Sequence, residues 1–324
     1  MKSATLDEVD RGLVHALQID GRAAFRTVGE VLGVSENTVS RRYRRLRAHG
    51  VLRVAGVVNG VPLGHTSWTL RLQCPPDAAE SLATALAARS DTSFVYLLSG
   101  GTEISCNVQT PSAADRDALL LRKLPRTGRV TAVSAHLLLR ATVLPHTWAG
   151  AACLTAEQAQ RLRPPAPSAA SDPVALGAHD RAMLDVLARD GRAGYRELGA
   201  VARVADSTAK RRLDALRRAG ILTYAVDIAP AALGFPTEAR LWMSVPPAAL
   251  ARTADAVARH PEVSFAAMTT GPSNLVAAVN CRDADGLSRY LTERVGALDA
   301  VRSLESAPVI RTLKRSGAPL PAGR

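Results

Sequence analysis

The sequence predicts an α+β protein made of two tandem units, each with a helix-turn-helix domain followed by a βαββαβ domain. Two observations lead to this fold class. Residues 6–52 recur without a gap at 176–222, where 19 of 47 positions are identical, so the chain contains a duplication. Within each copy, apolar residues first recur at helical spacing and then alternate as in strands, so each copy holds both domain types.

The repeat also sets the expected domain boundaries. The offset of 170 residues still holds where Leu63-Gly64 matches Leu233-Gly234. Between the copies, RPPAPSAASDP is typical of a linker, and Thr155 to Gln158 can cap one short helix inside it. The expected domains are residues 1–60 and 174–230 (helix-turn-helix), 61–144 and 231–315 (βαββαβ), and 145–173 (linker).

The composition allows packed cores and places the positive charge on arginine. The chain has 324 residues, 47% of them hydrophobic, and a formal net charge of +12. Of its 41 basic residues, only Lys2, Lys123, Lys210 and Lys314 are lysines. Arginine suits phosphates and guanine edges, but an Ala/Arg-rich composition also follows from a GC-rich genome. The placement of the arginines therefore counts for more than their number.

Several functional classes find no support in the sequence. The N-terminus lacks the apolar core of a signal peptide, and no apolar run reaches the roughly 18 residues of a membrane span, so we expect a cytoplasmic protein. The cysteines form no CxxC pair and the histidines no HExxH motif, so we expect no disulfide and no metal site, with Cys74, Cys106 and Cys281 as buried thiols. Walker, GxGxxG and GxSxG motifs are absent, so we expect no cofactor and no catalytic residue.

Three helices are expected at the start of each copy. In the first copy, apolar residues at helical spacing from Leu6 to Leu17 predict the first helix, and a shorter one is expected over 25–32. Gly33 supplies a tight turn, Ser35 is a natural N-cap for the third helix, and Gly50 ends it. A short helix, a glycine turn and a third helix predict a helix-turn-helix.

The third helix has an apolar side and a basic side. Val39, Tyr43 and Leu46 fall together at i, i+4 and i+7. The opposite side carries Asn37, Arg41 and Arg44, flanked by Ser40 and Arg45. A solvated basic helix face is the plain interpretation, and a DNA recognition helix is the sharper one.

These polar side chains have the chemistry that DNA reading requires. The Asn37 amide can pair bidentately with adenine, and the guanidinium of Arg41 or Arg44 with guanine. Thr38, Ser40 and Arg45 are better placed for phosphates, and Arg42 and Arg47 are expected in solvent at the flanks. The predicted DNA-binding residues of the first copy are Ser35, Asn37, Thr38, Ser40, Arg41, Arg44 and Arg45.

After the helices the pattern changes to strands. The run VLRVAGVV predicts one strand. Further strands are expected over 66–73, 93–99, 103–109, 130–139, 237–245, 263–270, 274–281 and 301–312, with helices over 77–89, 113–124, 247–258 and 283–296. This βαββαβ order is ferredoxin-like. Its helices cover one sheet face, so the other face needs a partner, and the second copy is already tethered to it.

The order of these elements resembles the Lrp/AsnC (feast/famine) family of transcription regulators, and each unit is similar to one whole member. The residues that carry the resemblance are Leu6, Asp10, Arg11, Leu17, Asp20-Gly21-Arg22, Val34-Ser35, Arg41-Arg42, Leu46, Gly50-Val51-Leu52 and Leu63-Gly64. The resemblance implies a winged-helix-like DNA-binding domain, an AsnC-type (RAM) ligand-binding domain, dimerisation through the latter, and modulation by an amino acid or other small metabolite.

The resemblance also implies a place for the effector. In the family it lies near a Gly-Asp-Tyr-Asp-like turn between the third and fourth strands. The matching turns here keep the glycines and Glu103 but otherwise depart from that pattern, and a plain β-turn is the alternative. The expected effector-binding residues are Gly100, Gly101, Thr102, Glu103, Gly271, Ser273 and Asn274.

The two copies differ on the predicted reading face. Arg41 keeps its match in Arg211, but Arg44 becomes Asp214, which repels phosphate. Asn37 and Ser40 become Ser207 and Lys210, Arg45 becomes Ala215, the turn glycine becomes Arg203, and the N-cap becomes Ala205. We expect the first copy to read DNA strongly. The second copy then binds weakly or at a different half-site through Ser207, Lys210 and Arg211, or is mainly structural.

Two other interpretations stay open. Tandem chains of this size also resemble sirohaem decarboxylases, which carry a His-Asn-Tyr stretch before Asn-Leu-Trp-Phe, but only Asn274-Leu275 matches here. An interaction-only protein with a decayed second helix-turn-helix is the other. The basic third helix favours a transcription regulator. Its expected partners are double-stranded DNA, a small-molecule effector and a second copy of the chain, in a homodimer or larger oligomer.

Overall fold

The computed structural model describes residues 6–124, 128–164 and 175–320. The chain folds into two compact units, and each unit takes one part from each copy of the repeat. Unit 1 comprises Met1–Leu63 and Ala151–Leu233, and unit 2 comprises Gly64–Gly150 and Gly234–Arg324. The Pro/Ala/Ser-rich end of the expected linker, residues 165–174, lies outside the described residues.

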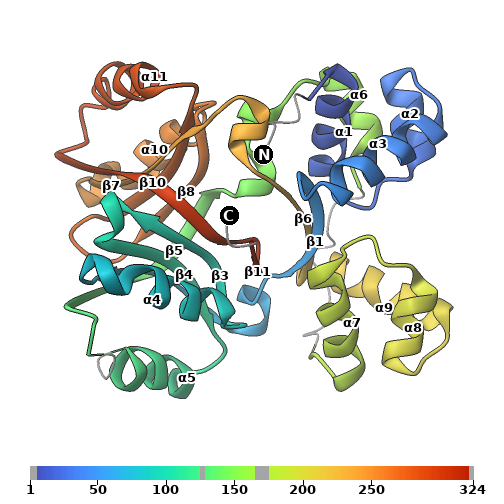
Figure 1. Ribbon diagram of the computed structural model, residues 1–324, viewed down its shortest axis with the longest axis horizontal. Helices are drawn as coiled ribbons and strands as arrows, with labels where there is room; N and C mark the ends of the chain where they lie inside the picture. Colours follow the sequence, from blue (N-terminus) through green and yellow to red (C-terminus); the bar gives the residue numbers. More distant parts are fainter. Residues whose placement is uncertain (1–5, 125–127, 165–174, 321–324) are drawn as a thin grey trace. The chain divides into compact units, whose positions relative to one another are not determined.

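Unit 1 holds both helix-turn-helix domains (Figure 1). The first consists of α1 (Glu8–Ile19), α2 (Phe25–Leu32), α3 (Glu36–Ala48) and β1 (Leu52–Val58). The second repeats this order with α7 (Ala178–Arg189), α8 (Tyr195–Ala202), α9 (Asp206–Arg218) and β6 (Leu222–Ile228). The predicted order of elements is thus confirmed in both copies.

A two-stranded antiparallel sheet joins the two helix-turn-helix domains. β1 and β6 pair along their whole length, from Leu52 opposite Ile228 to Val58 opposite Leu222. In Figure 1 these strands lie between α1–α3 and α7–α9. The close contact requires small residues, since a Cβ on Gly21 would meet the Tyr224 Cβ at 2.6 Å. The two domains of unit 1 therefore form one pseudo-symmetric pair within a single chain.

Two matching arginines clamp this pair from opposite sides. Arg22 donates to the carbonyls of Gly191 and Ala193, at 2.9 and 3.0 Å. Its counterpart Arg192 donates to the carbonyls of Gly21 and Ala23, at 2.8 and 3.0 Å. The Arg192 guanidinium also lies over the rings of Phe25 and Tyr43 (4.2 and 5.5 Å), and that of Arg22 lies over the rings of Tyr195 and Tyr224 (5.0 and 5.6 Å). These charge-assisted bonds and stacked guanidinium groups bind each domain to the other.

A short helix from the expected linker packs on the first helix-turn-helix domain. α6 (Ala156–Leu162) begins with the predicted capping box, in which Thr155 and Gln158 cap each other's backbone. Gln158 also donates to the carbonyl of Val31 at 2.9 Å. Just before the helix, the His15 Nδ1 accepts the backbone N–H groups of Cys153 and Leu154, at 3.0 Å each. The second domain has no such helix among the described residues, so α6 makes the two domains unequal.

We predict that this docking weakens as the pH falls. Burial lowers the pKa of His15 from its ordinary 6.5, and the two N–H groups require an unprotonated Nδ1. Unfolded His15 takes up a proton below about pH 6.5 while folded His15 does not, so the stability it contributes is lost on acidification. The Tm of His15→Phe should therefore fall less than the wild-type Tm between pH 7.5 and 5.5.

A matched control separates His15 from the other histidines. Burial also lowers the pKa of His260, but this residue lies in unit 2 and His260→Phe leaves the α6 contact intact. Each substitution should reduce the acid-induced fall in Tm by its own amount. In the double variant the two reductions should add. An equal fall for wild type and His15→Phe would refute the role of His15.

Unit 2 contains the two ferredoxin-like domains. The first has β2 (Thr66–Gln73), α4 (Pro76–Ala88), β3 (Thr92–Leu98), β4 (Glu103–Thr110), α5 (Ala113–Asp117) with a π-helical turn (Ala118–Lys123), and β5 (Ala132–Val143). The second has β7 (Thr237–Ser244), α10 (Pro247–Val257), β8 (Val263–Thr269), β9 (Leu275–Cys281), α11 (Ala284–Arg289) with a π-helical turn (Tyr290–Val295), β10 (Ser303–Arg315) and β11 (Ala318–Pro319). Both copies thus have the predicted βαββαβ order.

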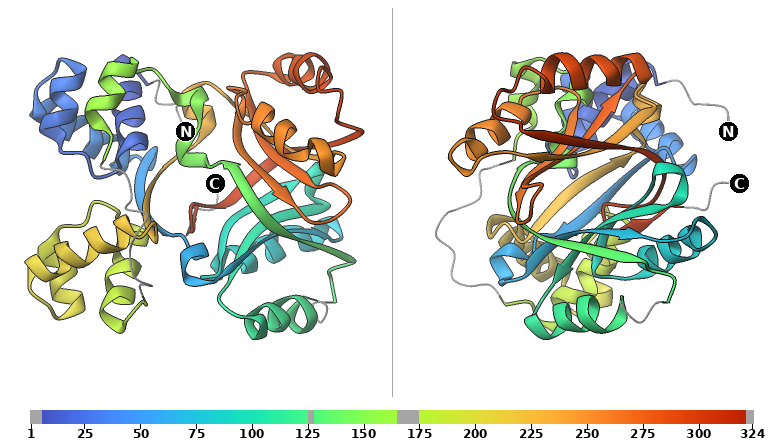
Figure 2. Two further views of the ribbon diagram at one scale, coloured as in Figure 1. Left: turned by 180° about the vertical axis from the view of Figure 1, so that it is seen from behind. Right: turned by 90° about the vertical axis from the view of Figure 1, so that its left-hand side faces the viewer.

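The last strand of each copy joins the sheet of the other copy. β5 pairs with β2 of its own copy and with β8 of the second (Figure 2). β10 likewise pairs with β7 and with β3. The described strands of unit 2 follow the order β11-β10-β3-β4-β2-β5-β8-β9-β7, and the β10–β7 pairing closes the ring. The expected association of the two copies is therefore built from shared strands.

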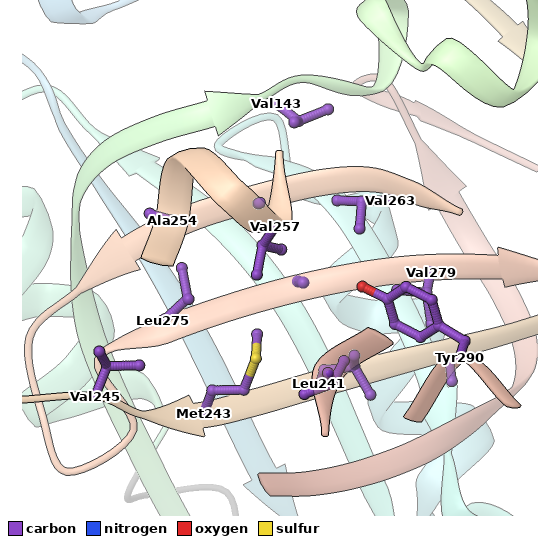
Figure 3. Packing of buried hydrophobic residues seen from close by; sticks show 14 of the residues in the cluster. Val143, Leu241, Met243, Val245, Ala254, Val257, Val263, Leu275, Val279 and Tyr290 are labelled. Carbon is purple, nitrogen blue, oxygen red and sulfur yellow. The ribbon is translucent and has the colours of Figure 1, made fainter. Parts of the chain in front are cut away.

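Each sheet packs its outer face against its own helices. In the second copy, Ala254 and Val257 of α10 lie against Leu241 and Leu275 (Figure 3). Val143 of β5 completes this core, and Leu313 of β10 packs on the first one. The sharing of strands thus extends to the cores.

The remaining structural predictions concern cysteines, metals and membranes. Cys74, Cys106 and Cys281 are buried free thiols, as expected. The described residues contain no cluster of three or more His, Cys, Asp or Glu arranged to hold a metal. Among the described helices, none is long and apolar enough to cross a bilayer.

Candidate nucleic-acid interface

The turn before α3 sets the direction of the recognition helix. Gly33 ends α2 in the left-handed region at φ 68°, where glycine is unstrained. Ser35 then caps α3, and its hydroxyl accepts the backbone N–H of Thr38 at 3.1 Å. α2 packs closely on this turn, since a Cβ on Gly29 would meet the Val34 carbonyl oxygen at 2.6 Å.

The apolar side of α3 faces the domain core. Val39, Tyr43 and Leu46 are buried, as the helical spacing predicts. The ring of Tyr43 lies 5.2 Å from that of Phe25 on α2, centre to centre. This packing directs the opposite side of the helix to solvent.

That opposite side exposes the residues predicted to read bases. Asn37, Arg41 and Arg44 are all exposed. Within the described part of the chain, neither Asn37 nor Arg41 has a hydrogen bond or ion pair, and Arg44 donates to the hydroxyl of Ser40 at 2.8 Å. The structure therefore brings together one amide and two guanidinium groups that are available to a ligand.

The structure corrects the predicted surroundings of the flanking arginines. Arg42 does not lie free in solvent, since it pairs with Asp7 and, at 3.3 Å, with Asp10. The backbone N–H of Asp10, together with the Arg42 guanidinium, holds the pKa of Asp7 below its usual range. Arg45, expected on phosphates, also bonds to Asp10, and Arg47 pairs with Asp190 of the second copy at 2.8 Å.

These ion pairs concentrate the uncompensated charge of α3. Residues 35–49 have five arginines and one acid, Glu36, so their sequence charge is +4. Three of the arginines have aspartate partners on α1 or in the second domain. The charge left for a polyanion lies mainly on Arg41 and Arg44. The pairing of these arginines could not be predicted from the sequence, because the partner aspartates lie far from α3 along the chain.

The matching helix α9 lacks the capping residue and the turn glycine that stabilise the start of α3. Ser207, Lys210 and Arg211 are exposed, as predicted. Its N-cap, Ala205, makes no side-chain cap bond, and the turn residue Arg203 has φ 55°, which is strained for a residue with a Cβ. Arg212 pairs with Asp180 at 2.7 Å, as Arg42 pairs with Asp10, so the duplicated ion pair serves the fold in both copies.

The second domain also has a cavity beside its recognition helix. This cavity of about 500 Å³ between α7 and α9 is lined by Gly177, Asp180, Thr208 and Ala215, among others. The first copy has Asp7 and Arg45 where the second has Gly177 and Ala215. This face of the second domain therefore lacks two charged side chains that the first domain has.

The predicted effector-binding residues lie in the β3–β4 and β8–β9 turns. Gly100 and Gly101 have φ of 73° and 90°, and a Cβ on either would meet no atom within 4 Å. Glu103, in contrast, is buried and paired with Arg71. In the second turn, the Asn274 amide both accepts from and donates to the backbone of Val245, at 2.9 and 2.8 Å. The side chains of two predicted effector-binding residues, Glu103 and Asn274, thus bond within the protein.

Comparison with known families matches both domain types. The model of the AsnC-type helix-turn-helix domain matches residues 6–47 and 178–217. The model of the Lrp/AsnC ligand binding domain matches residues 238–319. The first of these matches coincides with the domains that carry α3 and α9.

Individual relatives agree with this assignment. An uncharacterized HTH-type transcriptional regulator from Pyrococcus abyssi is 31% identical over 145 residues, which is 44% of this chain and 91% of that protein. Regulatory protein AsnC from Escherichia coli is 30% identical over 146 residues, 42% of this chain and 93% of that protein.

The siroheme decarboxylase NirDL shares the overall fold, with a TM-score of 0.63 over 96% of this chain and 94% of its own, at 14% identity. At this identity the likeness concerns the fold of the tandem arrangement. The sequence matches, the duplicated helix-turn-helix and the two ferredoxin-like domains together place this chain in the Lrp/AsnC family of transcription regulators, with two family units fused in tandem.

Proposed function

We propose that this chain regulates transcription by binding an asymmetric DNA site, which its first helix-turn-helix reads more strongly than its second. The observation that carries the proposal is the exposed face of α3, where Asn37, Arg41 and Arg44 lie opposite a buried apolar side. These groups suit adenine and guanine edges in the major groove. Ser35, Thr38 and Ser40 flank them as phosphate contacts, whereas Arg45, expected to bind phosphate, is held by Asp10.

The pairing inside unit 1 supports a site with two halves. Because β1–β6 pairing and the arginine clamp join the two domains, one chain presents two recognition helices, as a dimer of a one-unit regulator would. The two helices carry different side chains, so we propose that the two half-sites differ in sequence. Ser207, Lys210 and Arg211 are the proposed contacts of the weaker half.

Selection from random DNA tests this function. The full chain is mixed with a duplex library, bound molecules are amplified, and the affinity for the enriched site is measured between 50 and 200 mM salt. Enrichment of a non-palindromic site and a steep loss of affinity with salt are expected. A flat enrichment profile, or binding that is insensitive to salt, would contradict sequence-specific regulation.

We predict that Asp214→Arg strengthens binding to the enriched site. This substitution replaces a carboxylate on the face of α9 with the guanidinium that α3 has at Arg44, so it removes a repulsion and adds a phosphate or base contact. The gain should be about tenfold for one added contact, measured by fluorescence anisotropy. Asp185→Arg, on the exposed surface of α7, controls for net charge alone. Equal gains for both variants would contradict a DNA contact at position 214.

We further propose that a small metabolite modulates the protein at the turn Gly100–Glu103. The open space around Gly100 and Gly101 supports this choice, whereas a Cβ on Gly271 would meet His136 at 2.2 Å. A calorimetric screen of the common amino acids, repeated with Gly101→Val, tests it. A heat of binding that is unchanged in the variant would exclude this turn as the effector site. Analytical ultracentrifugation would show whether two chains also associate, as the family resemblance implies.

The decarboxylase alternative has a direct test. The likeness to NirDL extends over most of the chain, but the His-Asn-Tyr stretch has no counterpart at Phe94-Val95-Tyr96. Adding sirohaem and recording the absorption spectrum separates the two functions. A shifted Soret band, together with a lack of DNA binding, would favour the decarboxylase function over transcription regulation.

A further inference from the structure

The two sheets of unit 2 face each other across a layer of side chains that contains both aromatic and polar groups. We call it the inter-sheet layer. Its residues point away from the helices that cover each sheet and include Thr69, Arg71, Tyr96, Ser105, Asn107, Arg240, Trp242, Phe265 and Asn280. Arg71 is satisfied there, since it lies 3.8 Å from the centre of the Trp242 ring and pairs with Glu103 and Glu305.

Arg240 has no comparable partner in this layer. It is only 2% exposed, and its Nε and Nη2 atoms have no hydrogen bond among the described residues. Its guanidinium lies between the rings of Tyr96 and Phe265, at 5.2 and 5.4 Å. Burial lowers the pKa of Arg240, and the charges of Tyr96 and of Glu238, two residues before it on the same face of β7, act in the opposite direction. No carboxylate in the described chain, Glu238 included, lies within ion-pair distance of Arg240. Ring faces attract a cation but accept no in-plane hydrogen bond, so the edge of the guanidinium is left unsatisfied.

Four more polar atoms of the layer are buried without a hydrogen-bond partner in the described structure. They are the hydroxyls of Thr69 and Ser105, the Asn107 Oδ1 and the Asn280 Nδ2. Thr69 lies opposite Asn107 in the β2–β4 register, and Ser105 lies opposite Tyr96 in the β3–β4 register. Since the guanidinium of Arg240 lies over the Tyr96 ring, the polar groups of the first sheet face the cation of the second.

The two copies diverged to produce this arrangement. At the structurally matching positions, Thr69 corresponds to Arg240, Ser105 to Val276 and Asn107 to Ala278. The first sheet thus has three small polar side chains at positions where the second sheet has Arg240 and two apolar residues. A buried polar group without a hydrogen-bond partner is destabilising, and a buried charge is more so. A cluster of such groups therefore indicates a bound polar molecule or another function.

The atoms specify the chemistry of that guest. The unsatisfied edge of Arg240 and the Asn280 amide are hydrogen-bond donors, so an anionic oxygen would satisfy them. A carboxylate can bind the edge of a guanidinium group through two parallel hydrogen bonds. The Asn107 Oδ1 is an acceptor, so the bound molecule should also carry a hydrogen-bond donor. The hydroxyls of Thr69 and Ser105 can each donate or accept a hydrogen bond.

We propose that the inter-sheet layer of unit 2 binds a small carboxylate that also carries a hydroxyl donor, with the carboxylate on Arg240 and the donor on Asn107. This site is separate from the turns at Gly100 and Gly271. Binding there involves no DNA, so it stands or falls independently of the proposed regulatory function.

Thermal unfolding of the full chain with glycolate tests the site. Glycolate, acetate and the neutral isostere glycolamide are titrated in Tris chloride at constant ionic strength. A saturable rise in Tm is expected for glycolate, a smaller one for acetate, and none for glycolamide. An equal rise with glycolamide, or no rise with glycolate, would overturn the proposal.

Two variants assign the effect to the named residues. Arg240→Met should abolish the response to glycolate and raise the Tm in chloride alone, because it removes a buried unpaired charge. Asn107→Leu should make glycolate no better than acetate, and it keeps the proposal testable if the first variant does not fold. Arg116→Met, at a surface ion pair, should respond as wild type does. A response to glycolate that persists in Arg240→Met would refute the site.

Discussion

Replacing both Arg41 and Arg44 with alanine should lower the affinity for the selected DNA site at least about thirtyfold. Each guanidinium that contacts a base contributes about 1–3 kcal/mol, so two contacts together contribute about 2 kcal/mol or more. Both side chains are exposed and neither has an acidic partner in the described chain, so the loss appears in binding and leaves Tm nearly unchanged. Fluorescence anisotropy and thermal unfolding of the same samples measure the two effects.

A matched pair of substitutions in the second copy provides the control. Lys210→Ala with Arg211→Ala removes the same number of charges from α9, where Asp214 already repels phosphate. The affinity should fall less than with the α3 pair. An unchanged affinity for the α3 variant, or a larger loss for the α9 variant, would show that the first copy is not the main reader.

Breaking the arginine clamp should separate the two halves of the site. Arg22→Leu with Arg192→Leu removes four hydrogen bonds from charged donors to backbone carbonyls, each worth about 1.5–3 kcal/mol. Part of that cost is offset because the leucines stay packed among aromatic rings. The Tm of the variant should fall, and its affinity for DNA with both half-sites should drop at least about tenfold toward that for a single half-site.

Duplexes with one half-site distinguish this effect from general damage. Affinity for the stronger half-site alone should stay within about twofold of wild type, because α3 itself is unaltered. Arg189→Leu, at an exposed position of α7, should change neither value. If the clamp variant loses both affinities equally, the clamp serves only the fold.

Much of the fold follows from local sequence signals. The turn glycine and N-cap serine set the start of α3 within one residue, and the alternation of apolar residues predicts the strands of unit 2. The duplication made these assignments safer, since each element was observed twice. Local patterns succeed here because capping, turn chemistry and burial period all depend on near neighbours.

Features that depend on distant residues were not predictable in the same way. The ion pairs of Arg42 with Asp7 and of Arg47 with Asp190 join separate elements, so the apparent charge of α3 overstated what is available to DNA. The pairing of β5 with β8 depends on where the second sheet lies. The isolation of Arg240 becomes visible only when both sheets face each other, because the sequence does not show which buried groups lack partners.

Footprinting of the full chain on the DNA upstream of its own coding region tests the central claim most directly, since regulators of this family often act on their own and neighbouring genes. We predict two protected segments of unequal strength, on the same face of the duplex, both weakened when Arg41 and Arg44 are replaced. Absence of protection at low salt, or a footprint that the substitutions leave unchanged, would contradict DNA reading by α3.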